Sequence, residues 1–394
     1  MRSSDSPAPH AADVVVVGSG PAGLHGAARL AAEGYAVQLF EEHGVLGEPV
    51  HCTGVLAREA FETFGIPRGS ILNDLTTVRF HAPSGHTIEY SPAEIEAVVI
   101  DRVGFDHQLA QQAVDCGVII HTARATKIDI DATGVTVGGG EVSVRARACV
   151  LACGASYALH RRLDLGRPKL VLQSAQAELP ADRLGPVEVH FGNDVAPRGF
   201  AWAVPVERRD RRAVRIGVMC ASDALKHFRW MVDRVSRRWG IRDGASCVPR
   251  HKVLPLGPIR RTTRDRLVAV GDAGGLVKPT TGGGIYYSLL SAQLATDVLI
   301  PALKEDALGA ARLDAYERAW RAQIGSELRW QLILRRIAQR MSDADIDRLF
   351  DLARTDGLMP IVRRTARFNR HRDFIMALLK HPPARRVLIR AALA

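Results

Sequence analysis

The sequence predicts an α/β protein in which a parallel-sheet domain is interrupted by an antiparallel sheet and followed by a helical region. Three observations support this fold class. An apolar run and a glycine-rich turn open the chain, alternating strand-like runs fill its middle, and helical periodicity dominates from Leu308 onward. The 394 residues, 47% of them hydrophobic, are enough for two or three packed lobes.

The glycine-rich turn near the amino terminus predicts a dinucleotide site. The run Val14 to Val17 has the composition of a buried parallel strand, and a G-x-G-x-x-G sequence follows it at Gly18, Gly20 and Gly23. The first glycine permits a tight turn, the second lets backbone approach a pyrophosphate, and the third lets the next helix pack closely. That helix, expected from Ala22 to Gly34, would direct its first N–H groups at the phosphates.

An acidic residue at a suitable distance strengthens this interpretation. The strand expected from Val37 to Phe40 ends at Glu41, eighteen positions after Gly23. A carboxylate there can accept both hydroxyls of an adenosine ribose. No arginine follows Glu41 to bind a 2′-phosphate, so NADP is disfavoured. A glycine-rich turn of another kind of α/β protein is the alternative.

Composition and charge exclude several classes of function. The formal net charge of +11 comes mostly from scattered arginines, which suit an anionic substrate, redox partner or membrane face, or simply a solvated basic surface. No motif indicates a nucleic-acid partner. The six cysteines form no C-x-x-C and no histidine cluster accompanies them, so we expect no metal site. We expect a cytoplasmic protein without disulfides or a membrane-spanning helix, because no signal peptide or long apolar run occurs.

A loop rich in glycine and proline follows the second strand and leads to Cys52, which we expect to open a short helical stretch. Such loops lie at the carboxyl ends of parallel strands, where ligands bind, so Cys52 is a candidate active-site residue; an inert buried thiol is the alternative. Residues 76–90 alternate about a Pro-Ser-Gly turn and predict a β-hairpin. A helix is expected at 105–116, and strands at 98–100, 118–121, 125–130, 135–137, 142–144 and 149–152.

The middle of the chain predicts a second sheet. Its strands are expected at 170–177, 187–191, 200–206 and 214–220, with an amphipathic helix at 224–239 packed across them. The chain then returns to the first domain with a strand at 267–271 and a helix at 285–303. We assign residues 1–12 to a loose tail, 13–75, 98–168 and 262–305 to the dinucleotide-binding domain, 76–97 and 169–261 to the β-sheet substrate domain, and 306–394 to the C-terminal helical region.

Four separated motifs agree with one known family. They are GSGPAG with Glu41, IDRVGFDHQLAQQA, PRGFAWAVP and GDAGGLVKPTTGGGI. Together they resemble FAD-dependent oxidoreductases with the para-hydroxybenzoate hydroxylase fold, and most closely the geranylgeranyl reductase family. That family's strand P-x-G-(Y/F)-x-W-x-(F/I/V)-P is matched at residues 197–205, and its cysteine loop is matched at residues 51–54. Flavin halogenases carry a related strand.

The resemblance implies an FAD site whose residues can be named. The glycine motif would hold the pyrophosphate, Glu41 the ribose, and Arg102 would lie near the pyrophosphate and ribityl chain, unless it only pairs with a nearby aspartate. Asp272 would accept a ribityl hydroxyl, and the helix after it would favour an anionic reduced flavin; a plain helix cap is the alternative. The expected cofactor residues are Gly18, Gly20, Pro21, Ala22, Gly23, Glu41, Glu42, Cys52, Gly54, Arg102, Ala125, Gly271, Asp272, Gly283, Gly284 and Ile285.

The resemblance also implies the reaction, which is reduction of carbon–carbon double bonds in an isoprenoid chain by hydride from reduced flavin. Phe200, Trp202 and Pro205 would border the substrate cavity, and Cys52 would act near the double bond as an acid or positioning group. No Asp-Gly pair occurs at residues 152–155 and no second G-x-G-x-x-G is present, so a separate electron donor is expected. A flavin monooxygenase or halogenase of an aromatic or polyketide substrate, and a flavin-binding electron carrier, are the alternatives.

The C-terminal residues combine basic and apolar side chains at helical spacing. Such helices suit peripheral contact with the inner face of an anionic membrane, where an isoprenoid substrate with an anionic headgroup would be found. Ordinary helix packing with solvated arginines is the alternative.

Overall fold

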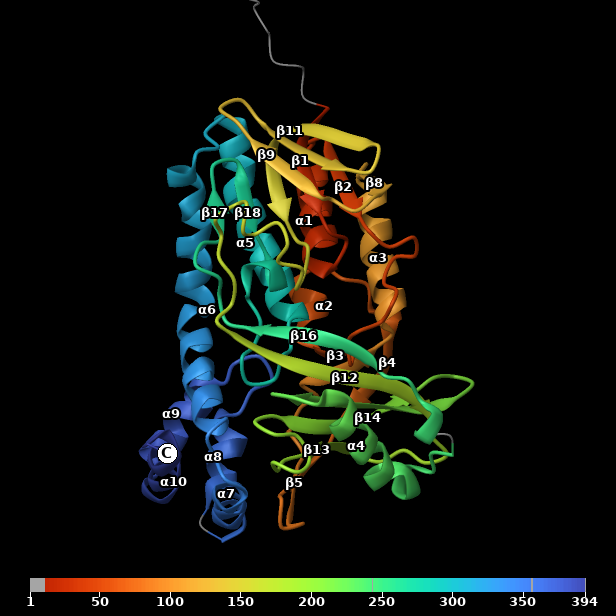
Figure 1. The fold of residues 1–394 in the computed structure, drawn as a ribbon, viewed down its shortest axis with the longest axis vertical. Coiled ribbons are helices and arrows are strands. Elements are labelled where there is room, and N and C mark those ends of the chain that lie inside the picture. The colour runs from red at the N-terminus through yellow and green to blue at the C-terminus, as the bar shows by residue number, and fades with distance from the viewer. Residues whose placement is uncertain (1–10, 243, 356, 394) are drawn as a thin grey trace, which may run out of the picture.

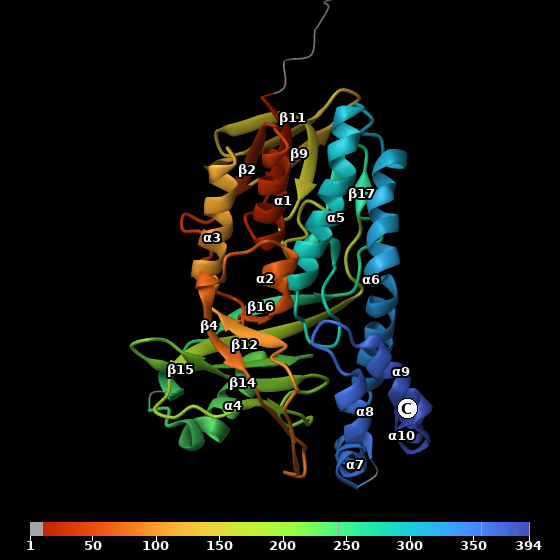
Figure 2. The ribbon, with the colours of Figure 1, turned by 180° about the vertical axis from the view of Figure 1, so that it is seen from behind.

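The computed structural model describes residues 11–242, 244–355 and 357–393. The tail expected at residues 1–12 therefore falls almost wholly outside the described residues. The elements form an upper domain built on one sheet, a lower domain built on a second sheet, and a column of helices beside both (Figures 1 and 2). The predicted fold class is confirmed.

The first sheet carries the glycine motif at its centre. Its order is β17-β18-β11-β1-β2-β8, with β10 pairing to β11 and β9 to β10. Strand β1 is parallel to both of its neighbours, so its carboxyl end lies in the middle of one sheet edge. The strands are β1 (Ala12–Val17), β2 (Val37–Glu41), β8 (Ile119–Thr122), β9 (Lys127–Ile130), β10 (Val135–Gly139), β11 (Val142–Leu151), β17 (Thr263–Arg264) and β18 (Leu267–Ala269).

Helices α1 (Pro21–Ala32), α3 (Arg102–Asp115) and α5 (Ile285–Lys304) cover one face of this sheet (Figure 2). Their buried side chains pack with alternate residues of β1 and β2, including Val14, Val16 and Leu39, in the largest core of the molecule. The other face packs against the β9–β10 hairpin and the segment after β11. Because both faces are covered, the strands are continuous apolar runs, which is why the sequence identified them.

The second sheet has seven strands in the order β16-β12-β15-β14-β13-β5-β6. Helix α4 (Ala224–Trp239) packs on one face, and the other face looks toward the first domain (Figure 1). The hairpin predicted at residues 76–90 joins this sheet through a parallel pairing of β5 with β13. The strands are β5 (Val78–His81), β6 (Thr87–Tyr90), β12 (Leu170–Pro180), β13 (Val187–His190), β14 (Phe200–Glu207), β15 (Arg212–Cys220) and β16 (Arg250–Leu256).

A small third sheet joins the two domains and corrects one expectation. Strand β3 (Val55–Ala57) begins three residues after Cys52, so the short helix α2 (Glu59–Thr63) begins later than the sequence predicted. Strands β4 (Ile71–Leu75) and β7 (Ala97–Ile100) complete this sheet in the order β3-β7-β4. Short 3₁₀ turns lie at Arg68–Ser70, Gly244–Ser246 and Gly271–Gly274.

The C-terminal region is helical, as predicted. Helix α6 (Ala310–Ala338) runs beside α5 and reaches from the first domain down to the level of the second sheet (Figure 1). Four shorter helices complete the chain: α7 (Asp343–Thr355), α8 (Leu358–Thr365), α9 (Arg372–Lys380) and α10 (Pro382–Leu393). Across the described residues, no helix has both the length and the apolar composition that a membrane crossing requires.

Candidate functional site

A cavity of about 510 Å³ opens at the carboxyl ends of β1 and β2, where ligands bind in doubly wound sheets. The segment after β11 and Lys252 of β16 complete its wall. The expected cofactor residues that line it are Gly18, Gly20, Glu41, Glu42, Cys52, Arg102 and Ala125. Those that do not line it are Pro21, Ala22, Gly23, Gly54, Gly271, Asp272, Gly283, Gly284 and Ile285.

The glycine motif has the close packing that its sequence predicted. Gly18 has a φ of +104°, and a Cβ there would lie 2.5 Å from the carbonyl oxygen of Ala152. A Cβ on Gly23 would lie 1.9 Å from the carbonyl oxygen of Gly18. Gly23 is therefore a packing residue, and Gly20, with open space around it, is the one that a ligand can approach. Gly20 is also the residue before α1, so free N–H groups of that helix face the cavity.

Glu41 is fixed at the end of β2 by its own hydrogen bonds. Its Oε2 accepts from the Ser19 backbone N–H at 2.9 Å and the Ser19 hydroxyl at 2.5 Å. Its Oε1 accepts from the His43 N–H at 2.9 Å. Burial alone would raise the pKa of Glu41, but these bonds outweigh it and hold the pKa below its ordinary value. The His43 ring also lies against this carboxylate, with its Nδ1 2.6 Å from Oε1, so Glu41 is a charged group fixed by four protein contacts at the cavity wall.

Arg102, at the start of α3, is largely covered by its neighbours and lines the cavity. Its Nη2 donates to both Asp106 carboxylate oxygens, at 2.8 and 2.6 Å, so the predicted alternative of an aspartate pair is also present. Burial lowers the pKa of Arg102, but Asp106 and the neighbouring Cys52 outweigh that effect and raise it. The Nε atom is buried without a partner. An orphaned donor on the wall of this cavity fits a dinucleotide phosphate or hydroxyl.

The loop that carries Cys52 is held from the second domain. Arg215 of β15 donates to the carbonyl oxygens of Thr53 at 2.7 Å and Ile100 at 2.9 Å. Gly54 has a φ of +70°, and a Cβ there would lie 2.3 Å from the Arg215 guanidinium. Gly54 is therefore needed so that Arg215 can pass behind the loop. Sequence reasoning missed Arg215 because this contact spans 162 positions of the chain.

The late glycine turn lies against an apolar face of the second sheet. A Cβ on Gly282 would lie 3.2 Å from Leu254 and 3.4 Å from the Met219 sulfur. These two residues belong to one apolar cluster on that face, which consists of Leu170, Leu172, Phe200, Trp202, Met219, Leu254 and Leu256. Asp272 lies beside the turn, since its Oδ1 is 2.7 Å from the Cβ position of Gly284. Lys252, which the sequence analysis did not identify, has its Nζ 3.8 Å from Asp272 Oδ2.

Two of the three predicted substrate-cavity residues lie on this apolar face, and one does not. The ring centroids of Phe200 and Trp202 are 5.7 Å apart, and the Trp202 indole covers Gly217, its partner on β15. The prediction for Pro205 was wrong, because side chains alternate along the regular strand β14. Pro205 pairs with Val214, a residue of the core under α4, and so faces away from Trp202.

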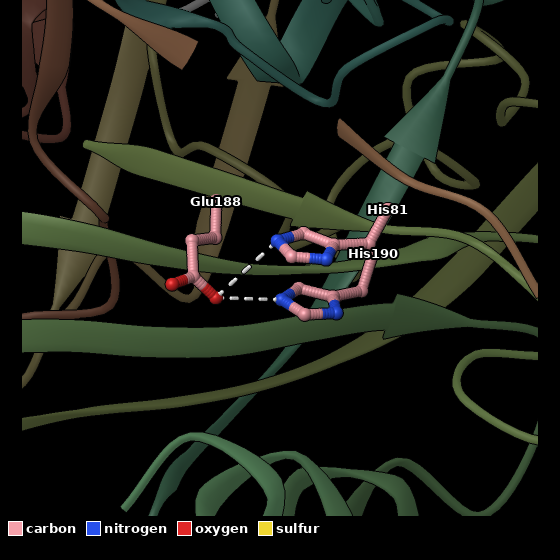
Figure 3. A group of neighbouring side chains, drawn as sticks. All are labelled: His81, Glu188 and His190. Carbon is pink, nitrogen blue, oxygen red and sulfur yellow. Dashed lines mark hydrogen bonds and ion pairs between the residues drawn. The ribbon is translucent and has the colours of Figure 1, made fainter. Parts of the chain in front are cut away.

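A histidine cluster outside this site was not predicted. His81, Glu188 and His190 have ligand-type atoms within 4.8 Å of one another (Figure 3). His81 belongs to β5, and the other two residues belong to β13, so no sequence motif predicts that the three lie together. Glu188 already accepts two hydrogen bonds from Arg238, at 2.9 and 2.6 Å, one from Trp239 at 3.2 Å and one from His190 at 2.8 Å. Since protein donors fill its oxygens, we treat the group as a structural cluster that joins α4 to the sheet.

Comparisons with known proteins agree with this geometry. A family model described as pyridine nucleotide-disulphide oxidoreductase matches residues 12–177. The digeranylgeranylglycerophospholipid reductase 2 of Methanothermobacter thermautotrophicus is 30% identical over 358 residues, covering 86% of this chain and 90% of that protein. A geranylgeranyl bacteriochlorophyll reductase-like structure from Thermoplasma acidophilum has a TM-score of 0.83 at 20% identity, covering 96% and 99% of the two chains. A variant of halogenase PltM, solved with FAD, has a TM-score of 0.69 at 15% identity, covering 96% of this chain and 85% of that one.

The fold and the sequence similarity define an FAD-dependent oxidoreductase. The similarity to the archaeal reductase, which extends over nearly all of that protein, narrows the class further. The chain belongs to the geranylgeranyl reductase family of FAD-dependent oxidoreductases, and the resemblance identified from the sequence motifs is confirmed.

Proposed function

We propose that this protein reduces carbon–carbon double bonds in an isoprenoid, geranylgeranyl-type chain. The observation that carries the proposal is the apolar cluster of the second sheet, which meets the glycine turn at Gly282. A prenyl chain offers only alkyl and alkene surface, so it needs such a face beside the cofactor. Relatives named for the reduction of digeranylgeranylglycerophospholipids support the same substrate class.

FAD is the proposed cofactor, and the residues present fit it. Gly18, Gly20 and the start of α1 would hold the pyrophosphate, Glu41 the adenosine ribose, and Arg102 the adjoining oxygens. Asp272 would hold the ribityl chain. When bound and reduced, FAD supplies the hydride that an alkene cannot obtain from a side chain. A separate protein or small-molecule donor would supply its electrons, because the chain carries one dinucleotide motif only.

The side chains would position the alkene and supply a proton. Phe200 and Trp202 belong to the apolar cluster, and their rings, tilted at 56° to each other, would give the double bond an aromatic surface to pack against. Cys52 lies on the cavity wall, its Sγ accepting from the Gly54 N–H at 3.3 Å with Arg102 beside it. We assign Cys52 as the source or positioning group for the proton that completes the reduction.

An anionic headgroup and peripheral membrane contact belong to the same proposal. The segment from α8 to the start of α9 exposes a basic patch formed by Arg363, Arg364, Arg367, Arg370 and Arg372. None of these arginines has a carboxylate partner among the ion pairs of the described residues. Such a patch suits the cytoplasmic face of an anionic bilayer, each arginine contributing about 1 kcal/mol near the surface. Vesicle flotation with and without anionic lipid tests this contact.

An anaerobic assay tests the reaction. Purified flavin-loaded protein is reduced with dithionite and mixed with geranylgeranyl diphosphate or a geranylgeranylated lipid. We expect flavin reoxidation together with a product heavier by two hydrogens per reduced bond. A Cys52→Ser variant should bind the lipid but turn over more slowly, whereas Cys116→Ser, at an exposed site on the first domain, should behave as wild type. Absence of reoxidation with every prenyl lipid would rule out the proposal.

Lys252 is the observation that favours a second candidate, a flavin-dependent halogenase or monooxygenase of an aromatic or polyketide substrate. Lys252 lines the cavity with its Nζ 3.8 Å from Asp272 Oδ2, and a halogenase would need a lysine near the flavin. The structural likeness to a halogenase shows the shared fold. This reaction needs oxygen, so product formation in air with a halide salt and an aromatic substrate, and none without air, would favour it.

A further inference from the structure

Lys278 is a buried cation in the loop between β18 and α5. The residue is 4% exposed. Its Nζ donates to the Phe368 carbonyl oxygen at 3.0 Å and to Asn369 Oδ1 at 3.1 Å, and it lies 4.1 Å from the centre of the Phe368 ring. All of these partners are neutral. The ion pairs found among the described residues do not include Lys278.

The ammonium group of Lys278 lies directly behind the glycine turn. A Cβ on Gly283 would lie 2.9 Å from Lys278 Cε and 3.4 Å from its Nζ. The Lys278 backbone also closes the loop, accepting from the Gly282 N–H at 2.8 Å and donating to the Gly283 carbonyl oxygen at 3.2 Å. Helix α5 begins at Ile285, directly after this turn. The ammonium group of Lys278 and the positive end of the 20-residue helix dipole therefore lie close together.

The surroundings leave this positive charge largely uncompensated. Glu59 of α2 acts on Lys278 from a distance, because its carboxylate is bonded to Asn369 Nδ2 at 2.8 Å. Arg335 of α6 adds a second buried cation to the same loop, held by carbonyl oxygens of Pro279 and Thr280. Burial lowers the pKa of Lys278 to about 7, which expresses the cost of a charge without a counter-ion. A negative charge on the other side of the glycine turn would offset that cost.

We propose that Lys278 stabilises negative charge on the bound flavin, acting through the Gly282–Gly284 turn without touching the cofactor. The inference rests on the proposed FAD site, in which this turn faces the isoalloxazine ring. Reduction places a negative charge on that ring, and a cation behind a thin backbone layer in a poorly hydrated interior attracts it. The alternative is purely structural, with Lys278 a hydrogen-bonded link between the loop and residues 368–369.

Sulfite binding separates the two roles without using the alkene reaction. Sulfite adds through its sulfur lone pair to flavin N5 of oxidised flavin, and the electron pair of the broken C=N bond moves toward the N1–C2=O edge, leaving a negative charge there. No other reactant is needed. The affinity of this adduct, read from loss of the yellow flavin absorbance, therefore reports positive potential near that edge. The reduction potential of the flavin, measured in parallel, should move in the same sense.

Three variants make the test specific. Lys278→Met removes the charge and should weaken sulfite binding roughly tenfold or more and lower the reduction potential. Asn369→Ala breaks the hydrogen-bonded link but keeps the charge, so it should stay within about threefold of wild type. Glu59→Gln, at an exposed residue, removes the carboxylate that favours the charged form of Lys278, so it should weaken sulfite binding at pH 7, and the difference from wild type should shrink as the pH is lowered and Lys278 becomes protonated in both proteins.

The inference is overturned if Lys278→Met binds sulfite like wild type, or if Asn369→Ala loses as much affinity as Lys278→Met. Should Lys278→Met lose its flavin, Glu59→Gln decides the question, and an unchanged affinity there rejects the inference. A wild-type protein that takes up no flavin refutes the proposed function instead.

Discussion

Adding a single methyl group at Gly217 tests whether Trp202 depends on the strand beneath it. Gly217 and Trp202 are cross-strand partners on β15 and β14. A Cβ at Gly217 would lie 2.2 Å and 2.4 Å from two indole ring atoms. Ordinary contact begins at 3.4 Å, so the indole must move by at least 1.2 Å. Overpacking of this kind costs about 1–3 kcal/mol.

We expect Gly217→Ala to lower the free energy of unfolding by that amount and to slow flavin reoxidation by prenyl substrate, because the indole is displaced across the apolar cluster. Thermal and denaturant melts measure the first effect, and the anaerobic assay measures the second. Gly185→Ala is a matched control, since a Cβ there would meet the ring of Trp239 at an ordinary 3.6 Å. It should change neither quantity.

A double-mutant cycle gives the decisive result. In a Trp202→Ala background the methyl group at Gly217 has no indole to displace, so the cost of Gly217→Ala should vanish. If Gly217→Ala destabilises the protein equally in both backgrounds, the steric explanation is wrong and the effect belongs to the β15 backbone.

Three further predictions follow from the site and its supports. Glu41→Gln should raise the dissociation constant for FAD about tenfold or more, measured by flavin fluorescence, since a charged acceptor for ribose hydroxyls is lost; an unchanged constant would place the ribose elsewhere. Arg335→Met should lower the free energy of unfolding by about 3 kcal/mol in denaturant melts, because buried carbonyl oxygens lose their donor, while the exposed Arg336→Met should have little effect. Acidification should destabilise the histidine cluster. Burial and the neighbouring His190 lower the pKa of His81 from 6.5 to about 4. Burial alone would raise the pKa of Glu188, but hydrogen bonds from His190 and Arg238 outweigh it and lower that pKa from 4.5 to about 2. Both groups bind fewer protons in the folded state than in the unfolded state, so the stability that His81 contributes is lost as the pH falls from 6.5 to 4, and that of Glu188 as it falls from 4.5 to 2. The melting temperature should therefore fall as the pH is lowered. Between pH 6.5 and 4 it should fall less steeply in the His81→Asn variant.

Strands that are buried on both faces, and helices with one apolar stripe, were predicted well. The apolar runs became β1 and β2, and the helix expected at residues 224–239 has the bounds of α4. Strand β11 was expected as two pieces, because basic residues at 145 and 147 interrupt its apolar run. Strand β16 was missed, because its sequence RHKVLPL begins with three basic residues and contains a proline. This segment is a strand because it pairs with β12 at seven registered positions.

The sequence by itself determined the dinucleotide motif and the strand–helix–strand order around it, because these depend on local turn chemistry and periodicity, and its four separated motifs carried the resemblance to the family. Glycine spacing, a strand before it and an acid after it are all read within about thirty residues.

Only the tertiary structure decided which side chains meet. It placed Arg215 behind Gly54, Trp202 over Gly217 and Lys278 against Asn369, and no local sequence pattern relates the members of each pair. It also turned Pro205 away from the face that its motif suggested. Contacts of this kind depend on how sheets and loops pack against one another, and short-range sequence periodicity does not predict that packing.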